Sequence, residues 1–485
     1  MTQKDGQREK LRSFFETVCR IPRQTGDEEK ISRFLVDFAQ SRGFEAERDA
    51  HNNVLIRKPS SIPGYQGPTV MVQGHMDMVY EKTPESAHRY EDGIRVVEEN
   101  GFLKSADQTS LGADNGLAVA YILDLLDRGD LQLPSLEFLI TTGEEVGLEG
   151  VKNLGLTDVK SAYLINLDAE EEGVFFTSCA GGVRTDLSLP LEYRTEMEEV
   201  TVVLELKGLS GGHSGLDIAL GRANAIKLLG KILRGVFPLA RISDLGSPGK
   251  ANAIASKGKI CMHTSKGGRD ALLSRLEDLK GELSREFRET EEVDFGITVT
   301  EEPKETAVFT DKTLQSVIRA ITFLPYGVIS RTREDINMVQ TSSNVGDMTV
   351  QNGRLVFLCS SRSSIKYEKE ELKEYMRILA ETLGMDCKFH GDYPQWEYKK
   401  VSRLRDICQK VYRQYAGREA VFTGIHAGIE CGYLSEKLGT QIDMISCGAN
   451  LHDVHTPRER ADLESFYRME EILIQILEEI SKAAE

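Results

Sequence analysis

The sequence predicts an α/β fold in which a mostly parallel sheet is interrupted by a separate α+β domain. Short apolar runs at 69–73, 136–141 and 162–167 are bounded by Gly, Asp or Pro, as is typical of buried strands. A helical pattern at 117–126 lies between the first two runs. Strands that alternate with helices indicate a parallel sheet, whose ligands normally lie beyond the carboxyl ends of the strands. The pattern changes from about residue 191, which is the third observation.

The first domain opens with helices. Thr25 and Glu28 have the spacing of a capping box, and apolar residues then recur at helical period over 31–39 until Gly43 offers a stop. We expect this second helix to pack against the sheet.

The second domain has an approximate βαββαβ order. Strands are expected near 200–206, 258–264 and 293–300, with helices near 217–235 and 272–279. A further run of helix, two strands and helix over 311–383 allows two ferredoxin-like halves, although no clear sequence repeat supports them. We therefore assign residues 1–190 and 393–485 to one discontinuous domain and 191–392 to an inserted domain.

Composition excludes several classes of function. The 485 residues carry 60 Lys and Arg against 77 Asp and Glu, a net charge of -17, without the basic stretch that nucleic-acid binding needs. No run of 18 apolar residues predicts a membrane helix, and charges interrupt the N-terminal apolar stretches, so we expect a cytoplasmic location. Eight scattered cysteines without a CxxC pair argue against a thiolate zinc site and a disulfide framework.

Five motifs carry residues suited to chemistry. In GHMDMV, a strand runs into His75 and Asp77, whose side chains share one side of the chain, so that one can bind a metal while the other orients it. In GADNG, Asp114 lies at a predicted helix start, where backbone N–H groups favour an anion; an N-capping aspartate is the simpler interpretation.

Three further motifs complete the set, and two of them directly follow apolar strands. They contain Glu144 and Glu145 in TTGEEVG, Asp168 after AYLINL, and His455 in HDVHTPRE. A glutamate pair alone is more often solvated surface. Together, however, two imidazoles and several carboxylates fit a two-metal hydrolytic site for zinc or a similar ion. Three ionised ligands facing two divalent cations leave room for one hydroxide at neutrality.

These motifs in this order, with GGHSG between Asp168 and His455, resemble the M20 metallopeptidase family. The long insert and the segment HAGIECG are most similar to its aminoacyl-histidine dipeptidase branch. The resemblance spans residues 8–480 and implies a zinc-peptidase-type catalytic domain with an inserted lid domain. One departure is Arg458, where the branch commonly has an acidic residue.

The resemblance implies a role for each motif residue. His75 and Asp168 would hold one zinc ion, Glu145 and His455 the other, and Asp114 would bridge the two. Asp77 would orient His75, and Glu144 would be the general base. A cis peptide would follow Asp114. His455 is preferred to His452 because Thr-Pro and Glu459 follow it at the family spacing, and His426 is assigned to support or packing.

The inserted lid domain would contribute substrate contacts. By the same resemblance, His213 would help stabilise the oxyanion, and Asn252 and Arg362 would bind the carboxyl-terminal part of the substrate. Without the resemblance, His213 would be taken for a turn histidine. A homodimer through the lid is a further expectation.

We thus expect a metal-dependent dipeptidase, of Xaa-His type, that uses zinc-activated water and accepts cobalt or manganese in place of zinc. An alternative is a related amidohydrolase that deacylates N-acyl amino acids, since these substrates also carry a carboxylate. A non-enzymatic alternative is a metal-binding or peptide-binding module on an inactive hydrolase fold, against which the retained Glu144 argues.

Overall fold

The computed structural model describes residues 3–155, 158–333, 338–439 and 441–482. The chain divides into two compact units. Unit 1 comprises residues 1–179, 396–424 and 429–485, and unit 2 comprises residues 180–395 and 425–428. Unit 2 begins at residue 180, where we expected the limit at 191, because the strand over 181–190 pairs with strands of unit 2; its main segment ends at 395, where we expected 392.

Unit 1 is built on an eight-stranded sheet in the order β1-β2-β6-β3-β7-β23-β8-β22. The four central strands β6, β3, β7 and β23 run parallel, which confirms the predicted mostly parallel sheet. The strands are β1 (Glu45–Arg48), β2 (Val54–Lys58), β3 (Thr69–His75), β6 (Leu136–Thr141), β7 (Ser161–Asn166), β8 (Val174–Cys179), β22 (Val421–Ile425) and β23 (Asp443–Ser446). Every residue of β6 is buried, as a central strand covered on both faces requires.

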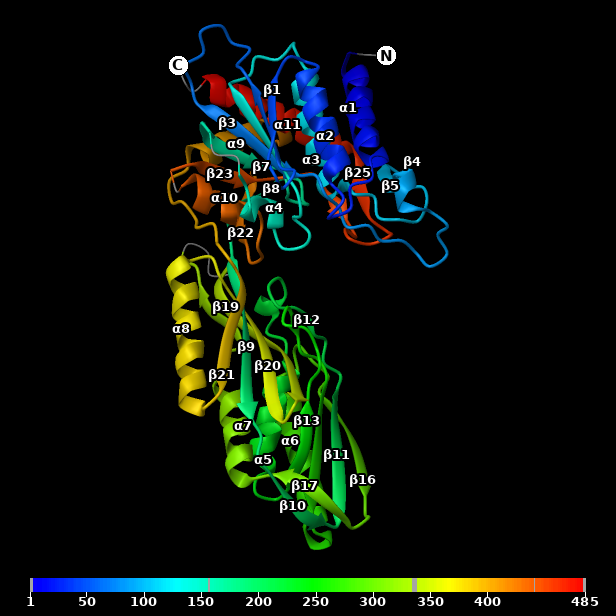
Figure 1. The fold of residues 1–485 in the computed structure, drawn as a ribbon, viewed down its shortest axis with the longest axis vertical. Helices are drawn as coiled ribbons and strands as arrows, with labels where there is room; N and C mark the ends of the chain where they lie inside the picture. Colours follow the sequence, from blue (N-terminus) through cyan, green and yellow to red (C-terminus); the bar gives the residue numbers. More distant parts are fainter. Residues whose placement is uncertain (1–2, 156–157, 334–337, 440, 483–485) are drawn as a thin grey trace. The chain divides into compact units, whose positions relative to one another are not determined.

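Helices cover this sheet. α3 packs against β3, α1 packs on α3, and α11 packs against α9 (Figure 1). The helices are α1 (Gln3–Arg20), α2 (Glu29–Gln40), α3 (Ala113–Asp127), α4 (Glu149–Lys152), α9 (Arg403–Ala416), α10 (Cys431–Leu438) and α11 (Leu463–Lys482). A small sheet beside them contains β4 (Val96–Glu99), β5 (Phe102–Ser105), β24 (Leu451–His452) and β25 (Arg460–Asp462).

The predicted capping box at the start of α2 is wrong. The helix begins at Glu29, and no side chain caps it. Instead, the Thr25 hydroxyl donates to Asp77 Oδ2 at 3.0 Å, and Glu28 Oε1 accepts the backbone N–H of Gly143 at 3.1 Å. Both side chains therefore bind loops at the carboxyl ends of β3 and β6. These tertiary hydrogen bonds take the place of the expected capping hydrogen bonds at the start of α2.

Unit 2 contains two larger antiparallel sheets. One has the order β13-β15-β11-β16, and the other has the order β18-β19-β20-β9-β21. Their strands are β9 (Gly181–Pro190), β11 (Val200–Lys207), β13 (Arg241–Gly246), β15 (Gly258–Thr264), β16 (Asp294–Thr300), β18 (Gly327–Arg331), β19 (Val339–Gln351), β20 (Arg354–Ser363) and β21 (Asp386–Tyr393). Two short ribbons pair β10 (Tyr193–Glu198) with β17 (Lys304–Phe309), and β12 (Gly212–His213) with β14 (Ala253–Ile254).

The helices of unit 2 share a core with its sheets. They are α5 (Ala225–Val236), α6 (Arg269–Glu286), α7 (Asp311–Phe323) and α8 (Lys366–Leu383). The helix expected over 217–235 is shorter, because Gly221 adopts a left-handed conformation and Asn224 caps α5 by accepting the N–H of Ile226. None of the described helices is long and apolar enough to cross a membrane.

Candidate metal centre

The candidate site of unit 1 lies where three parallel strands end. β3 ends at His75, β6 is followed by the loop that carries Glu144 and Glu145, and Asp168 comes two residues after β7. Since β3 pairs in parallel with both β6 and β7, their carboxyl ends lie at one edge of the sheet. The sheet topology therefore places three of the five motifs close together at this edge.

Asp114 connects the two histidines. Its Oδ1 lies 3.1 Å from His75 Nε2, and its Oδ2 lies 3.0 Å from His455 Nε2. His75 Nε2 is also 3.3 Å from Asp168 Oδ1, and His455 Nε2 is 2.9 Å from Glu145 Oε1. The cluster thus has two halves, each with one imidazole and its own carboxylate, that share the Asp114 carboxylate.

The cis peptide expected after Asp114 is present between Asp114 and Asn115. His455, in the loop between β24 and β25, joins the cluster, whereas His452 packs its ring against Phe102.

The Asp77 carboxylate contacts the ring of His75 and the backbone of both adjacent glutamates. Its Oδ1 lies 3.3 Å from His75 Nδ1 and accepts the Glu144 N–H at 3.2 Å, while its Oδ2 accepts the Glu145 N–H at 3.3 Å. Asp77 is fully buried. One carboxylate therefore fixes both the ring of His75 and the backbone of the two adjacent glutamates.

The pKa values of the cluster reflect burial and shared protons. Hydrogen bonds to Asp114 and Glu145 raise the pKa of His455 to about 11. Burial opposes ionisation of Asp114, but hydrogen bonds to His455 and His75 outweigh it and lower its pKa. Burial raises the pKa of Asp168 to about 6. A divalent cation would compete with protons for these same atoms.

Glu144 differs from its neighbour. Burial raises the pKa of Glu144 well above its usual range; the charge of His75 opposes this shift, and those of Asp168 and Glu145 add to it. A raised pKa favours the protonated form of this carboxyl group, which is the form that a general base must hold between accepting and returning a proton.

The donor atoms are those that divalent metals such as zinc prefer. His75, Asp114 and Asp168 each offer one ligand atom within 4.8 Å of the others, as do Asp114, Glu145 and His455. A third group of this kind joins His75 to Glu144 and Glu145. Imidazole nitrogens and carboxylate oxygens suit zinc and similar ions. The residues present thus fit a pair of cations that share Asp114.

Sequence reasoning missed three residues that shape this site. Asn115 accepts the His75 N–H through Oδ1 at 3.2 Å and donates to the carbonyl of Leu167 through Nδ2 at 2.7 Å. It therefore ties the end of β3 to the segment after β7. Thr25 and Glu28 support the neighbouring loops. Only the place of Asn115 directly after Asp114 gave a signal in the sequence.

The remaining predicted residues belong to unit 2. His213 Nδ1 accepts the backbone N–H groups of Gly215 and Leu216 at 3.2 and 3.0 Å, so a neutral His213 carries its proton at Nε2. Burial, and then the positive charge of Arg362, lower the pKa of His213 and favour the neutral form. The neutral ring can therefore donate a hydrogen bond through its Nε2–H group.

Arg362 lies close to His213. Its Nη1 donates to the Tyr393 hydroxyl at 2.8 Å, while its buried Nε has no hydrogen-bond partner among the residues that the structure describes. His426 contacts the Ser342 hydroxyl at 2.7 Å, and burial lowers its pKa to about 3. Asn252 has an exposed side chain, and its backbone carbonyl accepts the N–H of Ser214.

Comparison with known proteins decides the family. The model of the peptidase family M20/M25/M40 matches residues 71–479. The chain is 31% identical over 474 residues to the cytosol non-specific dipeptidase of Escherichia coli (strain K12), an alignment that covers 97% of each chain. The chain belongs to the M20/M25/M40 peptidase family. Membership in this metallopeptidase family implies binding of divalent metal ions, and the resemblance read from the motifs is confirmed.

Solved structures of similar proteins agree with the fold. An aminoacylhistidine dipeptidase from Vibrio alginolyticus is similar with a TM-score of 0.90 and 30% identity, over 97% of this chain and 96% of that chain. An aminopeptidase from Bacillus cereus has a TM-score of 0.60 and 16% identity over 98% of both chains, which is a likeness of fold alone. The predicted α/β domain interrupted by an α+β insert is thereby confirmed.

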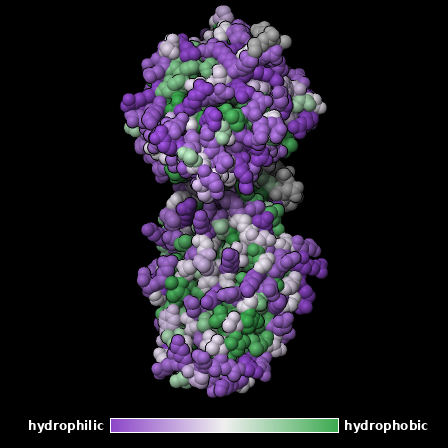
Figure 2. Space-filling model, turned by 90° about the vertical axis from the view of Figure 1, so that its right-hand side faces the viewer, coloured by the Kyte–Doolittle hydropathy of each residue, from purple (hydrophilic) through white to green (hydrophobic). Residues whose placement is uncertain are grey.

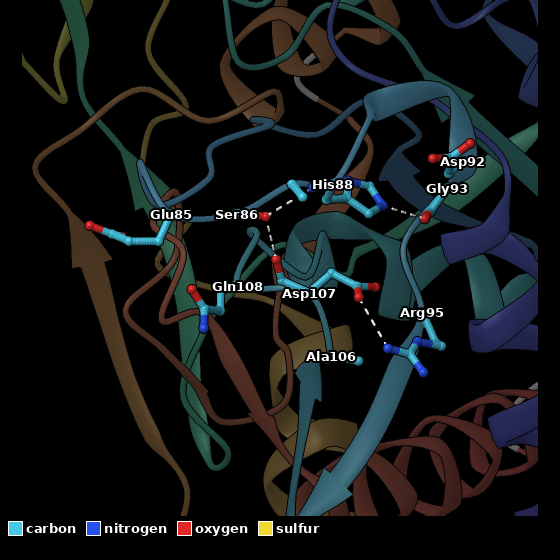
Figure 3. Close-up of a pocket in the computed structure, with 10 residues that line it drawn as sticks. Glu85, Ser86, His88, Asp92, Gly93, Arg95, Ala106, Asp107 and Gln108 are labelled. Carbon is cyan, nitrogen blue, oxygen red and sulfur yellow. Dashed lines mark hydrogen bonds and ion pairs between the residues drawn. The ribbon is translucent and has the colours of Figure 1, made fainter.

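A separate pocket of about 600 Å³ lies on unit 1 of this M20 chain, lined by residues 85–88, 92, 93, 95 and 106–108 (Figure 3). Its polar groups bind one another: Ser86 donates to the carbonyl of Asp107, and Arg95 pairs with the Asp107 carboxylate at 3.1 Å. None of the predicted site residues lines it. The cluster around Asp114 is therefore the better candidate for the site.

Proposed function

We propose that this M20 chain is a metal-dependent dipeptidase. The observation that carries the proposal is the shared Asp114 carboxylate, with one oxygen facing His75 and the other facing His455. In two-metal hydrolytic sites the ions lie about 3.5–4 Å apart, and a carboxylate placed between two ligand groups would be available to both ions. The activities of the relatives from Escherichia coli and Vibrio alginolyticus support dipeptides as substrates.

We assign His75 and Asp168 to one ion, Glu145 and His455 to the other, and Asp114 to both. Zinc is the proposed metal, with cobalt or manganese as substitutes, since the ligands are imidazole and carboxylate. Bound ions would supply Lewis acidity, polarising the scissile carbonyl and lowering the pKa of water. Asp77 keeps His75 Nε2 directed at the cluster through its contact with Nδ1.

Glu144 is the proposed general base. It takes a proton from the attacking water and returns it to the leaving amine, so the carboxyl group must hold the proton between the two steps. The raised pKa of this buried side chain supports that role. Glu145, whose Oε1 contacts His455, is assigned to metal binding instead.

Unit 2 supplies the remaining groups in this proposal. The Nε2 proton of His213 donates to the oxyanion of the tetrahedral intermediate. Arg362 binds the free carboxylate of the dipeptide with its planar guanidinium, and Asn252 contacts the same end of the substrate. The buried Nε of Arg362, which lacks a partner within the described parts of the chain, supports this assignment.

A dipeptide-library screen with added zinc tests the function. It includes Xaa-His dipeptides, β-Ala-His and N-acetyl amino acids, which separate Xaa-His specificity, broad dipeptidase activity and deacylation. We expect cleavage of dipeptides with a free amino group, with Xaa-His sequences among the best. Preference for N-acetyl amino acids would contradict the proposal and favour the deacylase alternative.

We also propose a cytoplasmic location and a homodimer through unit 2. The name of the Escherichia coli relative supports the location. Apolar residues are exposed on the face of unit 2 in Figure 2, and Ile297 and Val299 of the edge strand β16 are 37% and 38% exposed. An unpaired strand edge with apolar side chains suits association with a second copy. Light scattering of the full chain tests this state.

A further inference from the structure

A single buried carboxylate holds the segment that carries Asp114. Glu459 Oε2 accepts the backbone N–H groups of Leu111 and Gly112 at 2.7 and 2.9 Å. Its Oε1 accepts those of Ala113 and Asp114 at 2.7 and 3.3 Å. We expected an anion at this helix start, and Asp114 was the candidate. The anion that the N–H groups of α3 bind is instead the carboxylate of Glu459.

Arg23 binds the other side of the same segment. The guanidinium is fully buried and donates through Nη2 to the carbonyl of Gly112. Its Nη1 donates to the carbonyls of Met76 and Asp77 at 3.0 and 3.1 Å. Arg23 therefore joins the segment before Asp114 to the segment that follows His75.

The glycines of the GADNG motif make room for this arginine. Gly112 has a φ of 71°, in the left-handed region, and a Cβ there would lie 2.5 Å from Arg23 Nη2. A Cβ on Gly116 would lie 2.6 Å from the same atom. Both positions thus need glycine for reasons of space, and the first also for its backbone conformation.

We propose that Glu459 and Arg23 are positioning residues that hold the Asp114 carboxylate between the two metal ions. Glu459 follows His455 by four residues, so one loop carries both His455 and the carboxylate that fixes the backbone of Asp114. Through this clamp, defined as Glu459, Arg23 and the segment 111–114, the two halves of the metal centre keep their spacing. The inference rests on the proposed metal site and adds the residues that set its geometry.

Glu459→Gln tests the clamp. The amide keeps the size of the side chain, but its NH₂ group must face two backbone N–H donors, which removes hydrogen bonds to the segment. The matched control is Glu137→Gln. Glu137 is also buried and accepts the backbone N–H groups of Lys160 and Ser161, away from the cluster. Arg23→Lys is a second variant, since it keeps the charge but loses the fork.

Three measurements are made on each protein: zinc affinity by chelator competition, the visible spectrum of the cobalt-substituted enzyme, and the melting temperature of the metal-free protein. We expect Glu459→Gln to fold but to bind zinc about 10- to 100-fold more weakly, with an altered cobalt spectrum. Arg23→Lys should change both in the same direction. Glu137→Gln should lower the melting temperature and keep the affinity and spectrum of the parent.

Parent-like zinc affinity in Glu459→Gln would overturn the clamp, as would an equal loss in Glu137→Gln. Failure of both Glu459→Gln and Arg23→Lys to fold would also contradict it, because a positioning role requires a folded metal-free protein. A parent that binds two zinc ions but cleaves no dipeptide would contradict the proposed function alone. A parent that binds no zinc would overturn both.

Discussion

Asp77 Oδ1 lies 3.3 Å from His75 Nδ1, on the side of the ring opposite to Asp114 and Asp168. A proton at Nδ1, facing the carboxylate, leaves the Nε2 lone pair directed at the cluster. The same carboxylate accepts the N–H groups of Glu144 and Glu145. One buried side chain thus orients a ligand from β3 and the two glutamates that follow β6.

Asp77→Asn should weaken metal binding. The amide cannot accept through both of its terminal atoms, so the imidazole and the glutamate loop lose part of their support. We expect zinc affinity to fall about 10- to 100-fold, measured by chelator competition. Asp49→Asn is the control, since Asp49 also accepts backbone N–H groups, those of His51 and Asn53, outside the cluster. Equal weakening in the control would show that the effect is general destabilisation.

Glu144→Gln and Glu145→Gln should have different consequences. Removing a proton shuttle costs about 10² to 10⁴ in rate, so Glu144→Gln should bind two metal ions and lose kcat. Glu145→Gln should lose metal, because Glu145 contacts His455 in one half of the cluster. Metal content and kcat are measured on the same preparations. Equal metal loss in both variants would reverse the assignment of this pair.

Arg362→Met should affect substrates according to their carboxylate. A charged hydrogen bond contributes about 1.5–3 kcal/mol, so kcat/KM for free dipeptides should fall about 10- to 100-fold. The loss should nearly vanish for dipeptide amides, which the parent should use poorly. Tyr393→Phe is a companion variant, because it removes the hydroxyl that accepts from Arg362 Nη1. Equal cleavage of dipeptides and amides by the parent would exclude recognition of the carboxylate.

Glu470 should make stability depend on pH. Burial and, after it, the neighbouring Asp124 carboxylate together raise the pKa of Glu470 to about 9. A carboxyl group with a raised folded-state pKa binds more protons in the folded than in the unfolded state. Its contribution to stability is therefore lost as pH rises from about 4.5, near its ordinary unfolded value, to about 9.

Glu470→Gln should flatten this dependence. We expect the free energy of unfolding of the variant to exceed that of the parent at pH 9 by more than at pH 5, in urea titrations of both proteins. A parent and a variant with parallel pH profiles would show that Glu470 ionises normally.

Much of the metal centre was predictable from the sequence. Most of its residues lie at or just after the ends of β3, β6 and β7, and the apolar runs of these strands are clear in the sequence. The predicted strand at 136–141 coincides with β6, and His75 ends β3. Parallel pairing then brings together residues about 70 apart in sequence. The grouping of His75, Asp77, Asp114, Glu144, Glu145, Asp168 and His455 in unit 1 agrees with the motifs, while their individual roles remain predictions.

The supporting contacts could not be predicted, since they join local motifs to distant backbone. Thr25 and Glu28 have a capping-box spacing, yet their side chains turn to Asp77 and Gly143. Glu459 was noted only for its spacing from His455, and nothing local indicates that it binds residues about 350 positions earlier. Arg23 resembles an ordinary loop arginine in the sequence. Such contacts depend on tertiary packing, which periodicity does not encode.

The most direct test of the account is a zinc titration of the metal-free enzyme with dipeptide hydrolysis as the readout. The account predicts no measurable hydrolysis without metal, and a rise in activity that reaches its plateau at two equivalents of zinc per chain. Full activity in the metal-free protein, or a plateau at one equivalent, would contradict a hydrolytic centre of two metal ions that share Asp114.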